Sequence, residues 1–356
     1  MDTNRRYFHT FDTLRFFSFL LVFIHHIPIP NTSYFSFFSK SGGEGVVFFF
    51  VLSGFLITYV LVHEKKHKGA ISLKNFFARR VLRIWPLFYA ALLFAFSTSY
   101  LLDVLHIEHS SEGYEPNWLM SIFFLENYKM IITNSFPNVA PLRVMWSLCV
   151  EEHFYIVWGV LVSLVSLKRI PFIIFASIVF ANIARGLYIQ AGLITADLFT
   201  DLDYFAFGAI PAYILVVRGD IMKEVEEIPL TPKYTIAFAS VVLVFAIPNL
   251  SFTWLNFAAP LLYGTFFSAT ILFTLTQNNY LKIEKTWLSK LGVYTYGLYL
   301  FHTVIINLFL HIKIPNYKFS WVDILFLSLV STILVSIISY HVFEKQFLKL
   351  KKYFYN

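Results

Sequence analysis

Apolar stretches recur along almost the whole chain and are separated by short polar segments. Each is about 17 to 25 residues long, the length at which a helix crosses the hydrocarbon core of a membrane. They lie at residues 11–30, 43–62, 81–101, 146–167, 170–190, 202–217, 233–248, 256–276, 292–312 and 322–342. The pattern predicts an all-α integral membrane protein with about ten transmembrane helices in one bundle.

The remaining segments do not indicate another kind of domain. We find no internal repeat, no low-complexity linker and no soluble segment at either end, so residues 1–356 are expected to form one membrane domain without an appended soluble domain. The apolar run at 117–125 is too short to cross, and it indicates an interfacial or re-entrant segment. The first apolar run is not followed by a cleavage site of small residues, which favours a retained first helix over a signal peptide.

The composition agrees with a protein that lies in a bilayer. The chain is 58% hydrophobic and 14% charged, with a mean hydropathy of +0.65, whereas soluble domains are about 25% charged. The net charge of +7 does not indicate nucleic-acid binding, because the basic residues lie between apolar stretches instead of forming one face of a folded domain. The single cysteine, Cys149, excludes an internal disulfide and is expected to be a packing residue.

The distribution of basic residues predicts the orientation of the chain. Most of the 28 Lys and Arg residues lie in alternate loops and in the two tails. Cytoplasmic loops carry the excess of positive charge in membrane proteins. We therefore expect both termini to be cytoplasmic, an even number of spans, and a location in the plasma or inner cell membrane.

Two ionisable side chains in the first apolar stretch are candidates for function. Arg15 and His26 are eleven residues apart, which is about three helical turns, so they share a face and are separated by roughly 16 Å along the axis. His25 points about 100° away. Ionisable groups inside a membrane are costly and are usually functional. A snorkelling arginine and a histidine bonded within the bundle are the structural alternative.

The segment WSLCVEEHFY carries adjacent carboxylates in an apolar helix. Ser147, Glu151 and Tyr155 follow at four-residue steps and share one face. Glu151 is expected at the membrane depth of His26, and a carboxylate beside a histidine is the usual arrangement for general-base catalysis on a hydroxyl. A structural ion pair or a helix cap would explain the same residues.

Arginines at the start of the third long stretch form a candidate phosphate site. In KNFFARRVLRIWP, Arg80 and Arg83 lie on the same helical face. Guanidinium groups bind phosphates bidentately. Membrane topology alone would also place positive residues there.

These motifs, in this order, resemble the acyltransferase 3 family of membrane acyltransferases over nearly the whole chain. The family's arginine and histidine, separated by ten residues, match FDTLRFFSFLLVFIHH at Arg15 and His26. The stretch GVVFFFVLSGFLIT, which contains Ser53, resembles the second helix of the family. Arg80 and Arg83 match its paired arginines, and WSLCVEEHFY matches its WSLxxEExFY segment.

Weaker similarities follow in the second half of the chain. They are LDYFAFG around Asp203, LGVYTYGLYLFH with Tyr296, Tyr299 and His302, and the late Glu344. The arginine that many family members carry just before the LDYFAFG position is absent here.

The resemblance implies an O-acyltransferase that moves an acyl group, commonly acetyl, from cytoplasmic acyl-CoA to a hydroxyl of a surface or lipid-linked carbohydrate. His26 would be the catalytic base, with Glu151 and Arg15 as further catalytic residues. Acyl-CoA would be held by Arg80, Arg83 and Ser53. Four residues are expected to bind substrate: Ser147, Glu152, Tyr155 and His302. The expected partners are the carbohydrate acceptor and membrane lipid; neither a metal nor a nucleic acid is expected.

Two other classes of protein would account for the same composition. In a secondary transporter or flippase, Arg15, His26, Glu151 and Arg185 would form a proton or substrate pathway. The lack of an internal repeat and the order of the motifs favour the enzyme. A non-catalytic scaffold would leave the intramembrane ionisable groups unexplained.

Overall fold

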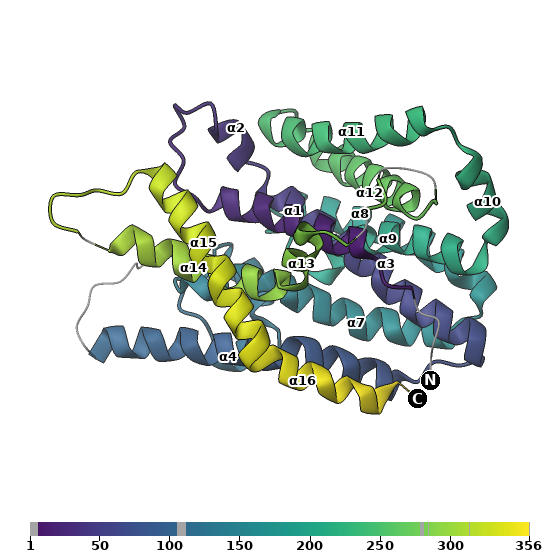
Figure 1. Ribbon diagram of the computed structural model, residues 1–356, viewed down its shortest axis with the longest axis horizontal. Helices are drawn as coiled ribbons and strands as arrows, with labels where there is room; N and C mark the ends of the chain where they lie inside the picture. Colours follow the sequence, from purple (N-terminus) through teal and green to yellow (C-terminus); the bar gives the residue numbers. More distant parts are fainter. Residues whose placement is uncertain (1–5, 105–111, 278–280, 284, 313, 356) are drawn as a thin grey trace.

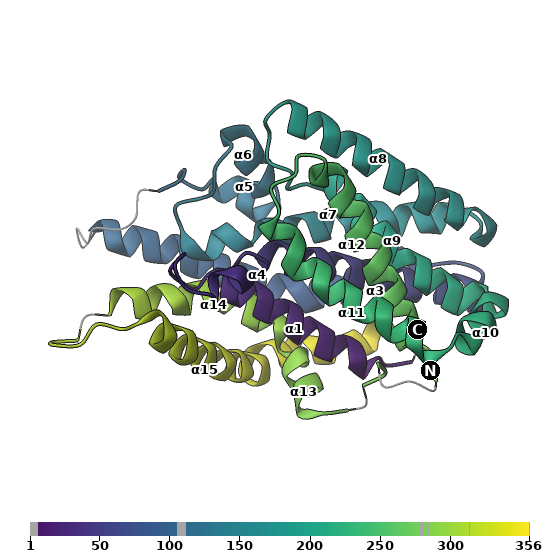
Figure 2. The same ribbon diagram turned by 90° about the horizontal axis from the view of Figure 1, so that it is seen from above.

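Most of the long helices run along one common direction and pack into a single bundle (Figures 1 and 2). This computed structural model describes residues 6–104, 112–277, 281–283, 285–312 and 314–355. No strand occurs among those residues, which contain only two isolated β-bridges. A helix bonds each backbone N–H within its own segment, which is the requirement that the interior of a membrane imposes.

The α-helices are α1 His9–His25, α2 Ser36–Ser39, α3 Gly42–Lys68, α4 Leu73–Val104, α5 Trp118–Ile122, α6 Glu126–Thr133, α7 Trp146–Leu164, α8 Ile170–Gln190, α9 Leu198–Val217, α10 Gly219–Glu227, α11 Leu230–Ala246, α12 Leu255–Thr274, α13 Trp287–Val293, α14 Thr295–His311, α15 Trp321–Ser339 and α16 Lys345–Lys349. A π-helical turn, η4, at Tyr340–Glu344 joins α15 to α16, and short 3₁₀ helices include η1 at Ala140–Val144 and η5 at Leu350–Phe354.

Each of the ten predicted stretches overlaps one of these helices, so the all-α membrane fold is confirmed. Within the described residues, eight helices are long and apolar enough to cross a membrane, and a ninth span results if α13 and α14, which meet at a 75° bend, are taken together. The tenth predicted span is α1, which has 17 residues. A helix of that length covers about 26 Å, slightly less than the roughly 30 Å of a hydrocarbon core.

The centre of the bundle is the contact between α3 and α9. A Cβ atom added to Gly54 would lie 2.0 Å from the carbonyl oxygen of Phe205, and one added to Gly208 would lie 1.9 Å from that of Val51. Only glycine permits two backbones to approach this closely. The Phe205 ring also stacks on Phe154 of α7, with centroids 4.1 Å apart, so α3, α7 and α9 form one packed core.

Both described ends of the chain lie at the same end of the bundle (Figures 1 and 2). The Arg6 backbone N–H donates to the Tyr59 hydroxyl of α3 at 3.2 Å. Near the other terminus, the carbonyl of Phe354 accepts a hydrogen bond from Arg79 of α4, whose guanidinium lies 5.6 Å from the ring of Tyr355. The side of the membrane that this end faces remains the prediction made from the basic residues.

Candidate active site

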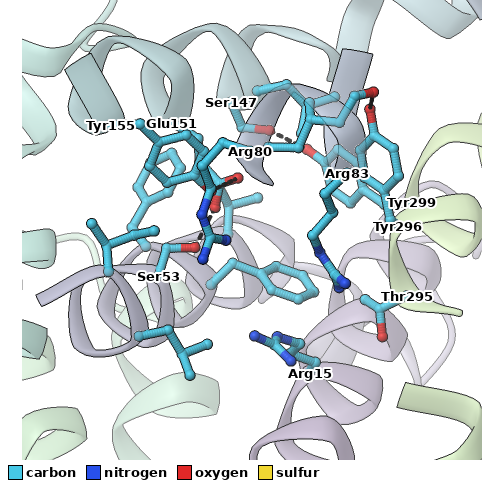
Figure 3. Close-up of a pocket in the computed structure, with 17 residues that line it drawn as sticks. Arg15, Ser53, Arg80, Arg83, Ser147, Glu151, Tyr155, Thr295, Tyr296 and Tyr299 are labelled. Carbon is cyan, nitrogen blue, oxygen red and sulfur yellow. Dashed lines mark hydrogen bonds between the residues drawn. The ribbon is translucent and has the colours of Figure 1, made fainter. Parts of the chain in front are cut away.

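Seven of the ten predicted site residues line one cavity of about 110 Å³ between α1, α3, α4, α7 and α14 (Figure 3). They are Arg15, Ser53, Arg80, Arg83, Ser147, Glu151 and Tyr155. The start of α14 completes the wall with Thr295, Tyr296 and Tyr299. Residues that are far apart in the sequence therefore converge on one small polar space.

Glu151 is held by two hydroxyl groups. The Ser53 hydroxyl donates to Oε1 at 2.5 Å, and the Tyr155 hydroxyl donates to Oε2 at 2.9 Å. Both carboxyl oxygens therefore accept a hydrogen bond from a neighbouring side chain. Tyr155 is four residues after Glu151 on the same helical face, so α7 itself aligns this pair, whereas Ser53 is contributed by α3.

Three arginines point into the cavity from α1 and α4 (Figure 3). Arg15 donates to Asp12 Oδ1 at 2.9 Å. In the described part of the chain neither Arg80 nor Arg83 pairs with a carboxylate, and the buried Nε of Arg80 has no hydrogen-bond partner there. Guanidinium groups in a cavity without a paired anion are suited to bind one from outside the chain.

Arg79 has a different role from its two neighbours. Its side chain is buried, forms an ion pair with Glu64 at 3.5 Å, and bonds the carbonyl of Phe354. Arg79 thus ties α4 to α3 and to the C-terminal segment, and the cavity does not include it.

His26 lies beyond this cavity, against His302 of α14, with ring centroids 4.9 Å apart. Nδ1 of His26 lies 2.8 Å from the carbonyl of Val22, and Nδ1 of His302 lies 2.6 Å from the carbonyl of Tyr299. A carbonyl only accepts hydrogen bonds, so each Nδ1 must carry the proton and each Nε2 keeps its lone pair. Nε2 of His302 is buried and has no partner among the described residues.

Tyr299 connects the cavity to the histidine pair. Its hydroxyl lies 2.8 Å from the Ser147 hydroxyl and 3.0 Å from the carbonyl of Val144, while its own carbonyl holds the ring of His302. One residue of α14 therefore closes the cavity and orients the second histidine.

The predicted pairing of His26 with Glu151 is wrong. The oxygens of Glu151 are occupied by Ser53 and Tyr155, and a backbone carbonyl orients His26 where a carboxylate was expected. The side chain that contacts Glu151 is thus Ser53 of α3, where the sequence predicted His26 of α1.

Glu152 and His302 were expected to bind substrate, but neither lines the cavity. Glu152 accepts a hydrogen bond from the Trp85 indole at 3.3 Å. His25 is exposed and bonds the carbonyl of Ser39 at 2.7 Å, so the helix separates it from His26 as its position predicted.

The fourth residue of the transporter pathway lies in a separate polar cluster. Arg185 of α8 donates to both carboxyl oxygens of Asp203 of α9, at 2.8 and 2.6 Å. Asp203 thus has an arginine partner from a neighbouring helix. Because this buried pair is satisfied and is not part of the cavity, the structure does not favour a continuous pathway from Arg15 to Arg185.

Comparison with known proteins gives the family. A family model described as an acyltransferase domain matches residues 8–341. The chain therefore belongs to this acyltransferase family, which confirms the resemblance inferred from its motifs. No solved structure matches the chain. Among the described residues, no group of three or more His, Cys, Asp or Glu side chains could hold a metal ion.

The curated relatives are bacterial proteins named for O-acetyl transfer. YrhL of Bacillus subtilis, provisionally named a peptidoglycan O-acetyltransferase, is 27% identical over 96% of this chain and 55% of its own length. A Staphylococcus aureus protein provisionally named an O-acetyltransferase is 28% identical over 97% of this chain and 58% of its own length. Peptidoglycan O-acetyltransferase OatA of Listeria monocytogenes is 31% identical over 44% of this chain and 24% of its own length. The chain thus spans little more than half the length of the first two.

Proposed function

We propose that this protein transfers an acetyl group from acyl-CoA to a hydroxyl of a cell-wall polysaccharide such as peptidoglycan, from a single membrane domain in the plasma membrane. The observation that carries the proposal is the combination of two unpaired arginines at the cavity with a histidine pair whose Nε2 atoms are free to accept protons. The family match and the names of the relatives support the same reaction.

The donor phosphates would bind at Arg80 and Arg83. Both residues lie in the first third of α4, near the end of the bundle that carries the two chain ends, and the basic residues predict that this end is cytoplasmic. A cavity of about 110 Å³ is too small for the nucleotide of the donor. The nucleotide would therefore stay at the arginines while the arm extends along Ser53 towards Tyr299.

His26 would act as the general base. As the acceptor oxygen attacks the thioester carbonyl, Nε2 takes the hydroxyl proton, the C–S bond breaks and the coenzyme A thiolate leaves, to be protonated in turn by the imidazolium. The Val22 carbonyl fixes the tautomer that this step requires. His302 would help position the acceptor, because its own Nε2 is free beside His26.

Glu151 would serve the reaction by shaping the cavity. It fixes the hydroxyl groups of Ser53 and Tyr155 and places a negative charge among Arg15, Arg80 and Arg83. Ser147, through its contact with Tyr299, would form the part of the wall nearest the histidines.

The proposal is tested with the full chain in lipid nanodiscs, radiolabelled acetyl-CoA and soluble peptidoglycan fragments, with mass spectrometry locating the acetylated hydroxyl. We expect transfer by the wild type and a loss of about 10² to 10⁴-fold in His26→Ala, the usual contribution of a general base. His25→Ala is the matched control, since that ring is exposed at the adjacent position, and it should retain most activity. Equal activity of His26→Ala and His25→Ala would show that His26 is not the general base.

A further inference from the structure

A second cavity, of about 700 Å³, contains neither histidine of the pair and is not used by the proposed reaction. It is formed by α3, α7, α8, α9 and α12 together with the segment that joins α11 to α12. Binding sites for small organic molecules usually have volumes of about 300 to 1,000 Å³. The cavity is therefore large enough for a sugar ring.

Two carboxyl groups in this cavity have oxygens without partners. Asp201 is 6% exposed, and its Oδ2 is buried with no hydrogen-bond partner among the described residues. Oε2 of Glu44 is in the same situation, while Oε1 accepts a hydrogen bond from Tyr263 at 3.3 Å. A buried acceptor without a partner costs free energy, so both oxygens are available to a ligand that donates hydrogen bonds.

The other groups that face the cavity favour a neutral, polyhydroxylated ligand. Arg185 lines it, but the charge of Arg185 is matched by Asp203. The rings of Trp146, Tyr204 and Tyr263 supply flat surfaces, which combine apolar faces with polar edges. Carboxyl acceptors beside aromatic faces suit a sugar, whose hydroxyl groups donate and whose C–H faces pack on rings.

The second cavity is separate from the histidine pair, where the acceptor hydroxyl would react, but it lies nearby. It includes neither His26 nor His302. However, the first turn of α3 packs on α1 next to His26: a Cβ on Gly42 would lie 2.4 Å from the Cβ of His25, the residue before His26, and the next two residues, Gly43 and Glu44, line the cavity. Val46 and Phe50 of α3 line both cavities.

We propose that this second cavity is a subsite for a neighbouring sugar of the polysaccharide acceptor, bound through Asp201 and Glu44, so that the sugar beside it reaches His26 across the first turn of α3. The inference rests on the proposed function. It adds that the enzyme distinguishes a polymeric acceptor from a short one, because only a chain of several sugars occupies both places.

The first experiment measures binding without the donor. A tetrasaccharide of alternating N-acetylglucosamine and N-acetylmuramic acid with its lactyl carboxyl groups amidated, so that the probe is neutral, and the corresponding disaccharide are titrated by calorimetry into the full chain in nanodiscs. We expect Asp201→Asn and Glu44→Gln each to weaken tetrasaccharide binding by up to about tenfold, the effect of losing a hydrogen bond to a buried carboxyl group. Disaccharide binding should not change. The matched controls are Asp220→Asn and Glu227→Gln, at exposed positions of α10, which should bind both sugars as the wild type does.

A steric variant tests the site without changing its charges. Ala259 of α12 lines the cavity, and Ala259→Phe should fill it and weaken tetrasaccharide binding even if a carboxyl variant fails to fold. In the transfer assay the same variants should raise the KM for the tetrasaccharide and leave the KM for acetyl-CoA unchanged.

Several outcomes would overturn the subsite. Unchanged tetrasaccharide affinity in the folded variants, or an equal loss for both sugars, would contradict it. Sodium binding that Asp201→Asn abolishes, with sugar affinity intact, would assign the cavity to a cation. If the wild type binds the tetrasaccharide more tightly than the disaccharide but transfers no acetyl group, the proposed reaction is contradicted and the sugar site is supported. Acetyl transfer to the tetrasaccharide and the disaccharide with equal KM would support the proposed reaction and contradict the subsite.

Discussion

Arg80 and Arg83 provide the sharpest residue-scale test of the donor. Each lines the cavity without a carboxylate partner in the described part of the chain. Arg80→Ala and Arg83→Ala should each raise the KM for acetyl-CoA by about ten- to a hundredfold, because a hydrogen bond to a charged group contributes about 1.5 to 3 kcal/mol. The value of kcat should change much less, since the phosphates do not take part in bond-making.

The control for this prediction is Arg218→Ala. Arg218 is exposed and pairs with Asp220 at the surface, so its loss removes one positive charge without touching the cavity. Equal acetyl-CoA KM values for Arg80→Ala, Arg83→Ala and Arg218→Ala would show that Arg80 and Arg83 do not bind the donor. Their positive charge would then reflect only the topology of the chain in the membrane.

The sequence identified most of the polar residues that line this cavity, some by their helical spacing and others, such as Ser53, by the resemblance to the family. Four-residue steps along α7 predicted that Ser147, Glu151 and Tyr155 share a face, and all three line the cavity. Periodicity gives the face and depth of a residue on its own helix, but not the rotation of one helix relative to the next. The expected contact between Glu151 and His26 failed for this reason, and the contact between His26 and His302 was not foreseen, since it depends on how α1 and α14 pack.

At the scale of the elements, the close approach of α3 and α9 predicts a steep penalty for added side-chain volume. Gly54→Ala and Gly208→Ala would each bring a Cβ to within about 2 Å of a carbonyl oxygen of the other helix. The backbones would have to move apart, and overpacking of this kind costs about 1 to 3 kcal/mol. Both variants should lower the midpoint of thermal unfolding in detergent micelles.

Gly219→Ala is the matched control for the two glycine variants. Gly219 begins α10, and an added Cβ there would meet nothing within 4 Å. This variant should unfold at or above the wild-type midpoint, because alanine costs less backbone entropy than glycine in a helix. Wild-type stability in Gly208→Ala would show that α3 and α9 are not packed backbone to backbone.

The apolar stretches located the ten long helices of the described residues, but they did not predict the short helix that precedes α14 at a sharp angle. The stretch at 292–312 contains all of α14 and only the last two residues of α13, and the two helices meet at 75°. No proline lies at this bend. Gly292 of α13 packs directly on the backbone of α1, where an added Cβ would lie 1.8 Å from the carbonyl oxygen of Asp12. The direction of α13 is thus determined by tertiary packing, which hydropathy does not report.

At the scale of the whole molecule, the structure constrains the number of spans. Helix α1 begins beside the later part of α3, where the ring of Phe8 lies 5.3 Å from that of Tyr59, and it ends beside the start of α3, where His25 meets Gly42. It therefore runs antiparallel to α3 between Tyr59 and Gly42, and we expect it to cross the membrane beside α3. Because both described chain ends lie at one end of the bundle, we expect an even number of crossings. Among the described residues there are eight candidate spans, or nine with the α13–α14 pair, and we expect α1 to be the tenth.

This count predicts the accessibility of single cysteines. The natural Cys149 is buried, so Cys149→Ser gives a background into which Ser33→Cys, Lys66→Cys, Glu115→Cys or Lys285→Cys can be introduced one at a time. We expect a membrane-impermeant maleimide to label positions 33 and 115 on intact cells, and positions 66 and 285 only after the membrane is opened, because the basic loops stay in the cytoplasm. Labelling of position 66 on intact cells would invert the orientation and place Arg80 and Arg83 away from cytoplasmic acyl-CoA. If position 33 were protected while position 115 reacted, α1 would not cross, and His26 could not meet an acceptor that arrives from outside.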